Sequence, residues 1–185
     1  TVAVHGCWSG AVAVGIELLG EWRLWRAPDL DDWQQRPLAE IDAVCDARLA
    51  RPQTMTNEWV NTLRDELLDE LTALPHGERR RSADIVEVRF LGGVARARSG
   101  SAANGRSSTD QFLLTLAGFE GSSEHVRSGL QPFVTGAVYL DHTDPAERVI
   151  RTRAAFGAEQ WDRLCAVKAA LDPHNRFRHG LVIEA

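Results

Sequence analysis

Two apolar segments, IVEVRFL at residues 85–91 and QFLLTL at residues 111–116, decide the fold class of this 185-residue chain. Apolar and polar residues alternate along the first, and the second is an apolar run of strand length, so both are expected to be β-strands. The connection between them is rich in Gly, Ser and Ala and shows no helical pattern, which predicts antiparallel neighbours. We therefore predict an α+β fold, with an antiparallel sheet, helices packed on one face and an open opposite face.

Further elements are expected on both sides of this pair. The segment 57–74 has the clearest helical periodicity, and Thr56 or Asn57 would cap it. Its apolar stripe is expected in the core and consists of Trp59, Leu63, Leu67, Leu71 and Leu74. Other helices are expected at residues 10–25 (capped by Ser9), 38–49, 123–131, 145–155 and 158–171, and other strands at residues 1–5, 136–140 and 181–183.

The composition narrows the possible function classes. With 44% hydrophobic residues and a net charge of −5, the chain can form a sizeable core but no long basic face, so nucleic acid is not an expected partner. The first residues lack a signal-peptide pattern and no apolar run reaches about 18 residues, so we expect a cytoplasmic protein without membrane contact. Cys7, Cys45 and Cys165 are widely spaced and form no zinc-type pattern, so no metal site is expected.

The segment Tyr139-Leu140-Asp141-His142 carries the most informative polar residues. On a strand at residues 136–140, Tyr139 and Asp141 would point to one face of the sheet and His142 to the other. A phenol, a carboxylate and an imidazole are the groups that proteins use for proton abstraction. Spacing alone leaves two interpretations open, a proton-transfer site or a polar turn at the end of a strand.

From Val138 onward the chain resembles the C-terminal segment of FAD-linked oxidases of the berberine-bridge-enzyme type. The matching residues are Tyr139, Phe156-Gly157, Arg163-Leu164, Lys168, the run DPHNRF at 172–177, and Ile183. Upstream, VEVRFLGGVARA at 86–97 resembles a strand of the same family, and Arg106 stands near the place of a family arginine. HGCWSGAVAVGIELLG at 5–20 resembles its strand–Gly–helix unit more weakly.

The resemblance implies an enzyme that oxidises a small organic molecule, such as a sugar, alcohol or secondary metabolite, by hydride transfer to FAD. It implies His142 and Tyr139 as catalytic candidates. It also implies Asp141 and Asn175 as cofactor-binding residues. From the residues alone, Asn175 and Phe177 either point the same way in an extended run, with Asn175 toward a ligand, or belong to a purely structural turn. The substrate-binding candidates are Arg89 and Arg106. Two positions depart from the family pattern: Asp141 replaces an asparagine, and His142 replaces a tyrosine that serves some members as base, so this chain has either a different proton acceptor or no activity.

The FAD-binding domain of such enzymes has no counterpart in these 185 residues. We therefore expect an incomplete substrate domain of a two-domain flavoprotein, with residues 1–135 as part of that domain and residues 136–185 as a tail packed with it. FAD would not be retained by this chain alone, and the FAD-binding domain would act in cis or in trans. The alternative interpretations are a non-catalytic binding or dimerisation module, acting as a homo-oligomer, and a subunit that completes its site with a separate FAD-domain chain.

Overall fold

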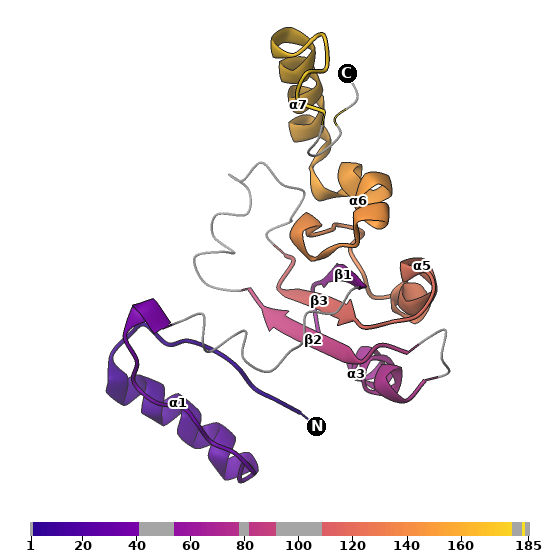
Figure 1. Cartoon of the computed structure of the whole chain (residues 1–185). Coiled ribbons are helices and arrows are strands. Elements are labelled where there is room, and N and C mark those ends of the chain that lie inside the picture. Colours follow the sequence, from indigo (N-terminus) through magenta and orange to yellow (C-terminus); the bar gives the residue numbers. More distant parts are fainter. Residues whose placement is uncertain (1, 41–53, 78–81, 92–108, 179–182, 184–185) are drawn as a thin grey trace. The chain divides into compact units, whose positions relative to one another are not determined.

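The computed structural model describes residues 2–40, 54–77, 82–91, 109–178 and 183 (Figure 1). The chain divides into two compact units, Thr1–Arg51 and Pro52–Ala185. The division predicted from the sequence, a partial substrate domain at residues 1–135 and a tail at residues 136–185, stays a prediction.

The first unit is built around helix α1 (Val12–Trp25), followed by the short 3-10 helix η1 (Leu38–Glu40). The strand expected at residues 1–5 is not formed by residues 2–5, which have no ladder partner among the described residues. The Ser9 cap is also wrong: the helix begins after Ala11, whose carbonyl oxygen accepts a bond from Trp8 Nε1 at 2.9 Å. Residues 41–49 of the second expected helix lie outside the described part of the chain.

The second unit contains a three-stranded antiparallel sheet with the strand order β1-β3-β2. The strands are β1 (Met55–Val60), β2 (Ile85–Phe90) and β3 (Phe112–Ala117). In the register, Leu114 of β3 lies opposite Glu58 on one side and Val88 on the other. The α+β class and the antiparallel pairing of the two segments that decide the fold are therefore confirmed.

Helices cover one face of this sheet, here called the core face. Helix α3 (Asp65–Ala73) and helix α5 (Ser123–Arg127), with the 3-10 helices η2 (Leu74–His76) and η4 (Ser128–Leu130) that follow them, supply its cover. The buried core residues are Val60, Leu67, Leu71, Leu74, Ala83, Leu114, Leu116, Phe119, Val126 and Leu130. Side chains alternate along each strand, so Trp59 and Leu113 point to the opposite face, here called the pocket face.

The helix expected at residues 57–74 is wrong in its first half. Residues 55–60 form the edge strand β1, and the helix α3 begins only at Asp65, after Arg64 and without a side-chain cap. The four-residue apolar spacing is misleading here because it runs from β1 into α3. Trp59 on β1 and Leu67 on α3 are both buried, but on opposite faces of the sheet. The expectation that the stripe lies in the core is confirmed for its buried members Trp59, Leu67, Leu71 and Leu74.

The strand expected at residues 136–140 is also wrong. An isolated bridge joins Val60 to Val134, and Leu140–His142 forms the 3-10 helix η5 instead. Residues 135–151 nevertheless lie along the free edge of β1, where its carbonyl groups need partners. The carbonyl oxygens of Met55, Asn57 and Trp59 accept from Asp144 N at 2.7 Å, Arg151 Nη1 at 3.0 Å and Thr135 N at 2.9 Å.

The C-terminal helices follow the sequence predictions closely. Helix α6 (Pro145–Arg151) begins at an Asp144 cap, the 3-10 helix η6 (Thr152–Ala155) continues it, and helix α7 (Ala158–Leu171) ends before Pro173. Ile183 is not in a strand, and the rest of the strand expected there lies outside the described residues. No helix among the described residues is long and apolar enough to span a membrane.

Candidate functional site

The pocket face carries an open pocket of about 350 Å³, close to the lower end of small-molecule sites. Its lining is mainly apolar, with three polar side chains, Arg89, Tyr139 and Asp141, which come from β2 and from the start of the tail. The apolar lining consists of Trp59, Leu91, Leu113, Val138, Leu140, Ala155 and Phe156. The pocket is therefore suited to a small, largely apolar organic molecule with a polar reacting end.

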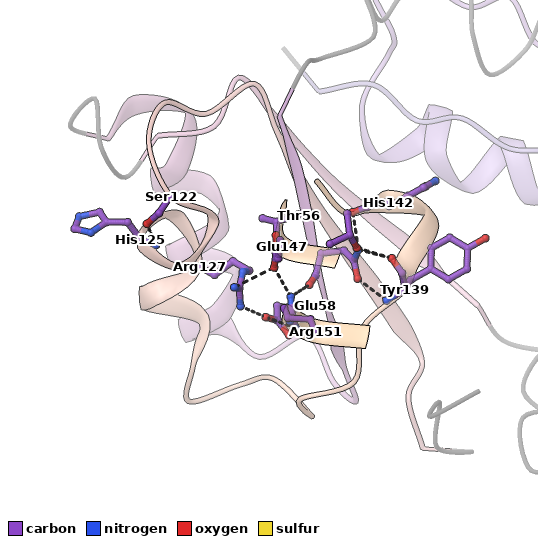
Figure 2. A network of polar contacts seen from close by, with 11 residues as sticks. Thr56, Glu58, Ser122, His125, Arg127, Tyr139, His142, Glu147 and Arg151 are labelled. Carbon is purple, nitrogen blue, oxygen red and sulfur yellow. Dashed lines mark hydrogen bonds and ion pairs between the residues drawn. The ribbon is translucent and has the colours of Figure 1, made fainter. Parts of the chain in front are cut away.

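The turn that brings Tyr139 and Asp141 to the pocket is held by Asn57 of β1, which is fully buried. Asn57 Nδ2 donates to the carbonyl oxygens of Tyr139 at 2.7 Å and His142 at 2.6 Å, and to Thr143 Oγ1 at 3.0 Å. Asn57 Oδ1 accepts from Tyr139 N at 2.8 Å. Figure 2 shows these bonds at the base of the turn, with the rings of Tyr139 and His142 pointing away from them.

Tyr139 and His142 are brought together, although an unbroken strand would have separated them. Their ring centroids are 5.2 Å apart in an edge-to-face arrangement. Tyr139 lines the pocket, whereas the half-buried His142 lies next to it and has its Nδ1 3.5 Å from Thr115 Oγ1 of β3. The η5 turn thus replaces the alternation of a strand and puts the phenol and the imidazole side by side.

The surroundings push the pKa values of these two groups apart. Burial, and then the nearby Arg89 guanidinium, lower the pKa of His142, against the opposing effects of Glu87 and Asp141. Burial, followed by the hydrogen bond and charge of Asp141, raises the pKa of Tyr139 above its ordinary value. At neutral pH the imidazole is therefore neutral and able to accept a proton, while the phenol stays protonated and acts as a donor.

Arg89 is the described member of the predicted substrate-binding pair, and its side chain lines the pocket. Arg89 Nε and Nη2 donate to Glu87 Oε1, at 3.2 Å and 2.8 Å. Glu87 lies two residues earlier on β2, and both bonds are exposed to solvent. A ligand anion would compete with Glu87 for this guanidinium. Arg106, the other member, lies outside the described residues.

Asn175 is not among the pocket-lining residues and stands in the turn after α7. It has a left-handed backbone with φ of 48°, so the extended run expected around it is not formed there, and Phe177 is exposed. The turn is organised by Asp172, whose carboxylate accepts from Lys168 Nζ, from Arg176 N at 2.6 Å and from Phe177 N at 3.0 Å. These donors, the Lys168 ammonium first, lower the pKa of Asp172. In the described structure, this motif is a helix-ending turn.

A buried ion cluster lies on the other side of β1, at the edge of the core face (Figure 2). Arg127 of α5 and Arg151 of α6 each contact both Glu58 and Glu147, with N···O distances from 2.5 to 3.0 Å. Thr56 adds a 2.9 Å bond to Glu147. The cluster fastens the start of the tail to the sheet, and burial outweighs both arginines in raising the pKa of Glu58.

Sequence reasoning found Tyr139, Asp141 and Arg89 but missed Asn57 and Trp59. Both were assigned to the expected helix at residues 57–74. The signal available in the sequence was Asn57, a polar residue between Thr56 and Trp59, which both favour strands. An asparagine buried in such a strand needs hydrogen-bond partners from elsewhere in the chain. The described residues contain no cluster of three or more His, Cys, Asp or Glu side chains suited to a metal ion.

The pocket lies where the C-terminal segment meets the sheet. A family model described as "Berberine and berberine like" matches residues 138–184, about a quarter of the chain. No curated protein matches the chain. The match confirms the resemblance of the tail to FAD-linked oxidoreductases of the berberine-bridge-enzyme type, and it begins at the residues that form the pocket.

Proposed function

We propose that this chain supplies the substrate side of an FAD-dependent active site that oxidises a small organic molecule. The observation that carries this proposal is that the segment matching the family model contributes Val138, Tyr139 and Asp141 to a pocket on the sheet. A sugar, an alcohol or a secondary metabolite with an apolar body would fit the volume and the lining. We assign to this site the residues predicted from the sequence: Arg89, Tyr139 and Asp141, which line the pocket, and His142, which lies next to Tyr139.

The residues present fit the edge of a flavin ring and do not fit a whole dinucleotide. A pocket of about 350 Å³ accommodates one small organic molecule. The Asp141 carboxylate would hold the polar edge of the ring, while the rest of FAD would need a separate binding domain. When bound, FAD supplies the redox chemistry by accepting a hydride from the substrate.

The protein groups would then orient the substrate and move its proton. Tyr139, kept protonated, would donate its one hydroxyl hydrogen to the reacting oxygen or nitrogen of the substrate in place of Asp141. His142, kept neutral, would accept the proton that leaves as the substrate is oxidised, and proton transfer of this kind contributes about a hundred- to ten-thousand-fold in rate. The apolar walls around Trp59 and Leu113 would exclude water from the reacting end.

The test is to produce the chain together with its flavin-binding domain and to follow absorbance near 450 nm. The proposal predicts bound flavin that is bleached anaerobically by at least one member of a panel of sugars, alcohols and secondary metabolites. Replacing Leu113 by Trp, which fills the pocket from the sheet, should slow bleaching while the flavin stays bound. A complex without flavin, or bleaching that is unaffected by Leu113→Trp, would overturn the proposal.

A further inference from the structure

We propose that Asn57 is a positioning residue, whose carboxamide fixes the η5 turn on the sheet so that Tyr139 and Asp141 face the pocket and His142 stays beside Tyr139. This inference rests on the proposed function and adds a residue to it from a distant part of the chain. Asn57 does not line the pocket. It would act only through the turn that it holds.

The first argument is the concentration of the contacts of Asn57. All four side-chain hydrogen bonds of Asn57 end on residues 139–143, which lie more than 80 positions away in the sequence. They satisfy the amide N–H of Tyr139 and the carbonyl oxygens at both ends of the turn. The Asn57 amide is itself fully buried, and a buried polar group that is left without a partner costs about 1–3 kcal/mol.

The second argument is that the turn has few other supports of its own. Within it, His142 N donates to the Tyr139 carbonyl at 3.2 Å and Thr143 Oγ1 to the same oxygen at 2.8 Å. These bonds close the turn but do not orient it on the sheet. The 3.5 Å approach of His142 Nδ1 to Thr115 is long for a hydrogen bond. Thr135 and Asp144, on either side of the turn, are held to β1 by backbone bonds, so Asn57 orients residues 139–143 between these two anchors.

The third argument is chemical, because few side chains could replace Asn57. The site needs a donor group facing three oxygens and an acceptor facing one N–H, within one short, buried side chain. Aspartate has the same shape but would set a carboxylate oxygen against two carbonyls and a hydroxyl. Serine could satisfy one of the four bonds. A substitution here should therefore release the turn without removing any residue of the pocket.

The experiment compares His142 and Tyr139 titrations by NMR in the 185-residue chain and in two variants. In Asn57→Ser the released turn exposes His142 to water and moves it away from Arg89, so its pKa should rise toward the ordinary value. The groups that face His142 are Thr115 of β3, Glu87 and Arg89 of β2, and Tyr139 and Asp141 of the turn. The raised pKa of Tyr139 should fall at the same time, because its burial and its bond to Asp141 are lost.

Thr56→Val is the matched control. Thr56 is the neighbouring residue of β1, is equally buried, and loses one hydrogen bond, but it points toward Glu147 rather than the turn. Urea unfolding should show a loss of stability for both variants, whereas only Asn57→Ser should change the two titrations. Wild-type titrations in Asn57→Ser, or an equal change in Thr56→Val, would overturn the proposal.

A measurement on the unchanged chain covers the case in which Asn57→Ser does not fold. The Tyr139 amide is outside the sheet ladder, yet it donates to buried Asn57 Oδ1, so it should exchange with solvent as slowly as the amides of β1. Rapid exchange of this amide would contradict the proposal. None of these readouts needs flavin or substrate, so failure of the positioning role and failure of the proposed function are distinguishable.

Discussion

Successive residues of β1 point to opposite faces of the sheet, and the two faces use buried polar groups in different ways. Glu58 points to the edge of the core face and enters a closed cluster with two arginines and Glu147. The Asn57 side chain points to the pocket face, and its hydrogen bonds go to the turn that carries Tyr139 and His142. The first arrangement fastens the tail to the sheet, and the second orients the site residues of that tail. Substitutions on the two faces should therefore separate stability from site geometry.

The largest single loss of stability is expected at one of two neighbouring leucines of β3, which lie on different faces. Leu114 and Leu113 are both almost fully buried, but Leu114 lies in the core and Leu113 lines the pocket. Leu114→Ala leaves a closed cavity and should lower the free energy of unfolding by about 4 kcal/mol. Leu113→Ala enlarges an open pocket that water can fill and should cost about 2 kcal/mol. Urea denaturation measures both, and equal losses would contradict the distinction.

The next difference concerns the acidic residues of the two faces. Glu58→Ala should lower the free energy of unfolding by about 3 kcal/mol, the lower end for a broken buried pair, because each arginine keeps Glu147. Glu87→Gln breaks the exposed pair with Arg89 and should cost less than about 1 kcal/mol. Urea denaturation at neutral pH tests both. If Glu87→Gln lost as much stability as Glu58→Ala, the difference in burial between the two ion pairs would not explain their contributions to stability.

The smallest effect is electrostatic and is confined to the pocket face. Arg89→Gln removes a cation that lowers the pKa values of both His142 and Tyr139, so both should rise. The pKa of His142 should remain below its ordinary value, because burial is the main cause of its shift. NMR titration of the two side chains gives the result directly. A fall in either pKa would mean that Arg89 does not act on this pair.

The fold class could be predicted because strands β2 and β3 follow local patterns of apolar residues, and because the sequence between them shows no helical pattern. β1 could not, since its sequence MTNEWV buries Asn57 and Glu58, polar residues whose partners lie about 70 to 95 positions further along. The tail around residue 138 was misread as a strand for a related reason. The backbone groups of Tyr139 bond to a side chain, Asn57, and direct bonds to the neighbouring strand β1 are made before and after it, at Thr135 and Asp144.

The candidate site was predictable in its residue types and not in its geometry. Tyr139, Asp141 and His142 stand together in the sequence, but the turn that places Tyr139 next to His142 depends on a distant asparagine. Arg89 was identified from its strand, whereas its pairing with Glu87 is visible only in the structure. The sequence left two interpretations of Asn175 open, a ligand contact and a structural turn, and its left-handed backbone in the turn organised by Asp172 favours the second.

The most direct test of the central claim, that His142 is the proton acceptor at the pocket, is the pH dependence of flavin reduction in the complete enzyme from pH 5 to 10. A neutral base with a lowered pKa is fully competent at neutral pH, so the wild-type rate should be level above about pH 7 and fall only toward acid. His142→Phe should be slower by about a hundred-fold or more on that plateau. In Tyr139→Phe the rate should still fall toward acid pH, because His142 is unchanged in this variant. A wild-type rate that still climbs through pH 9 to 10, with His142→Phe unchanged, would assign the base to Tyr139 and contradict the account.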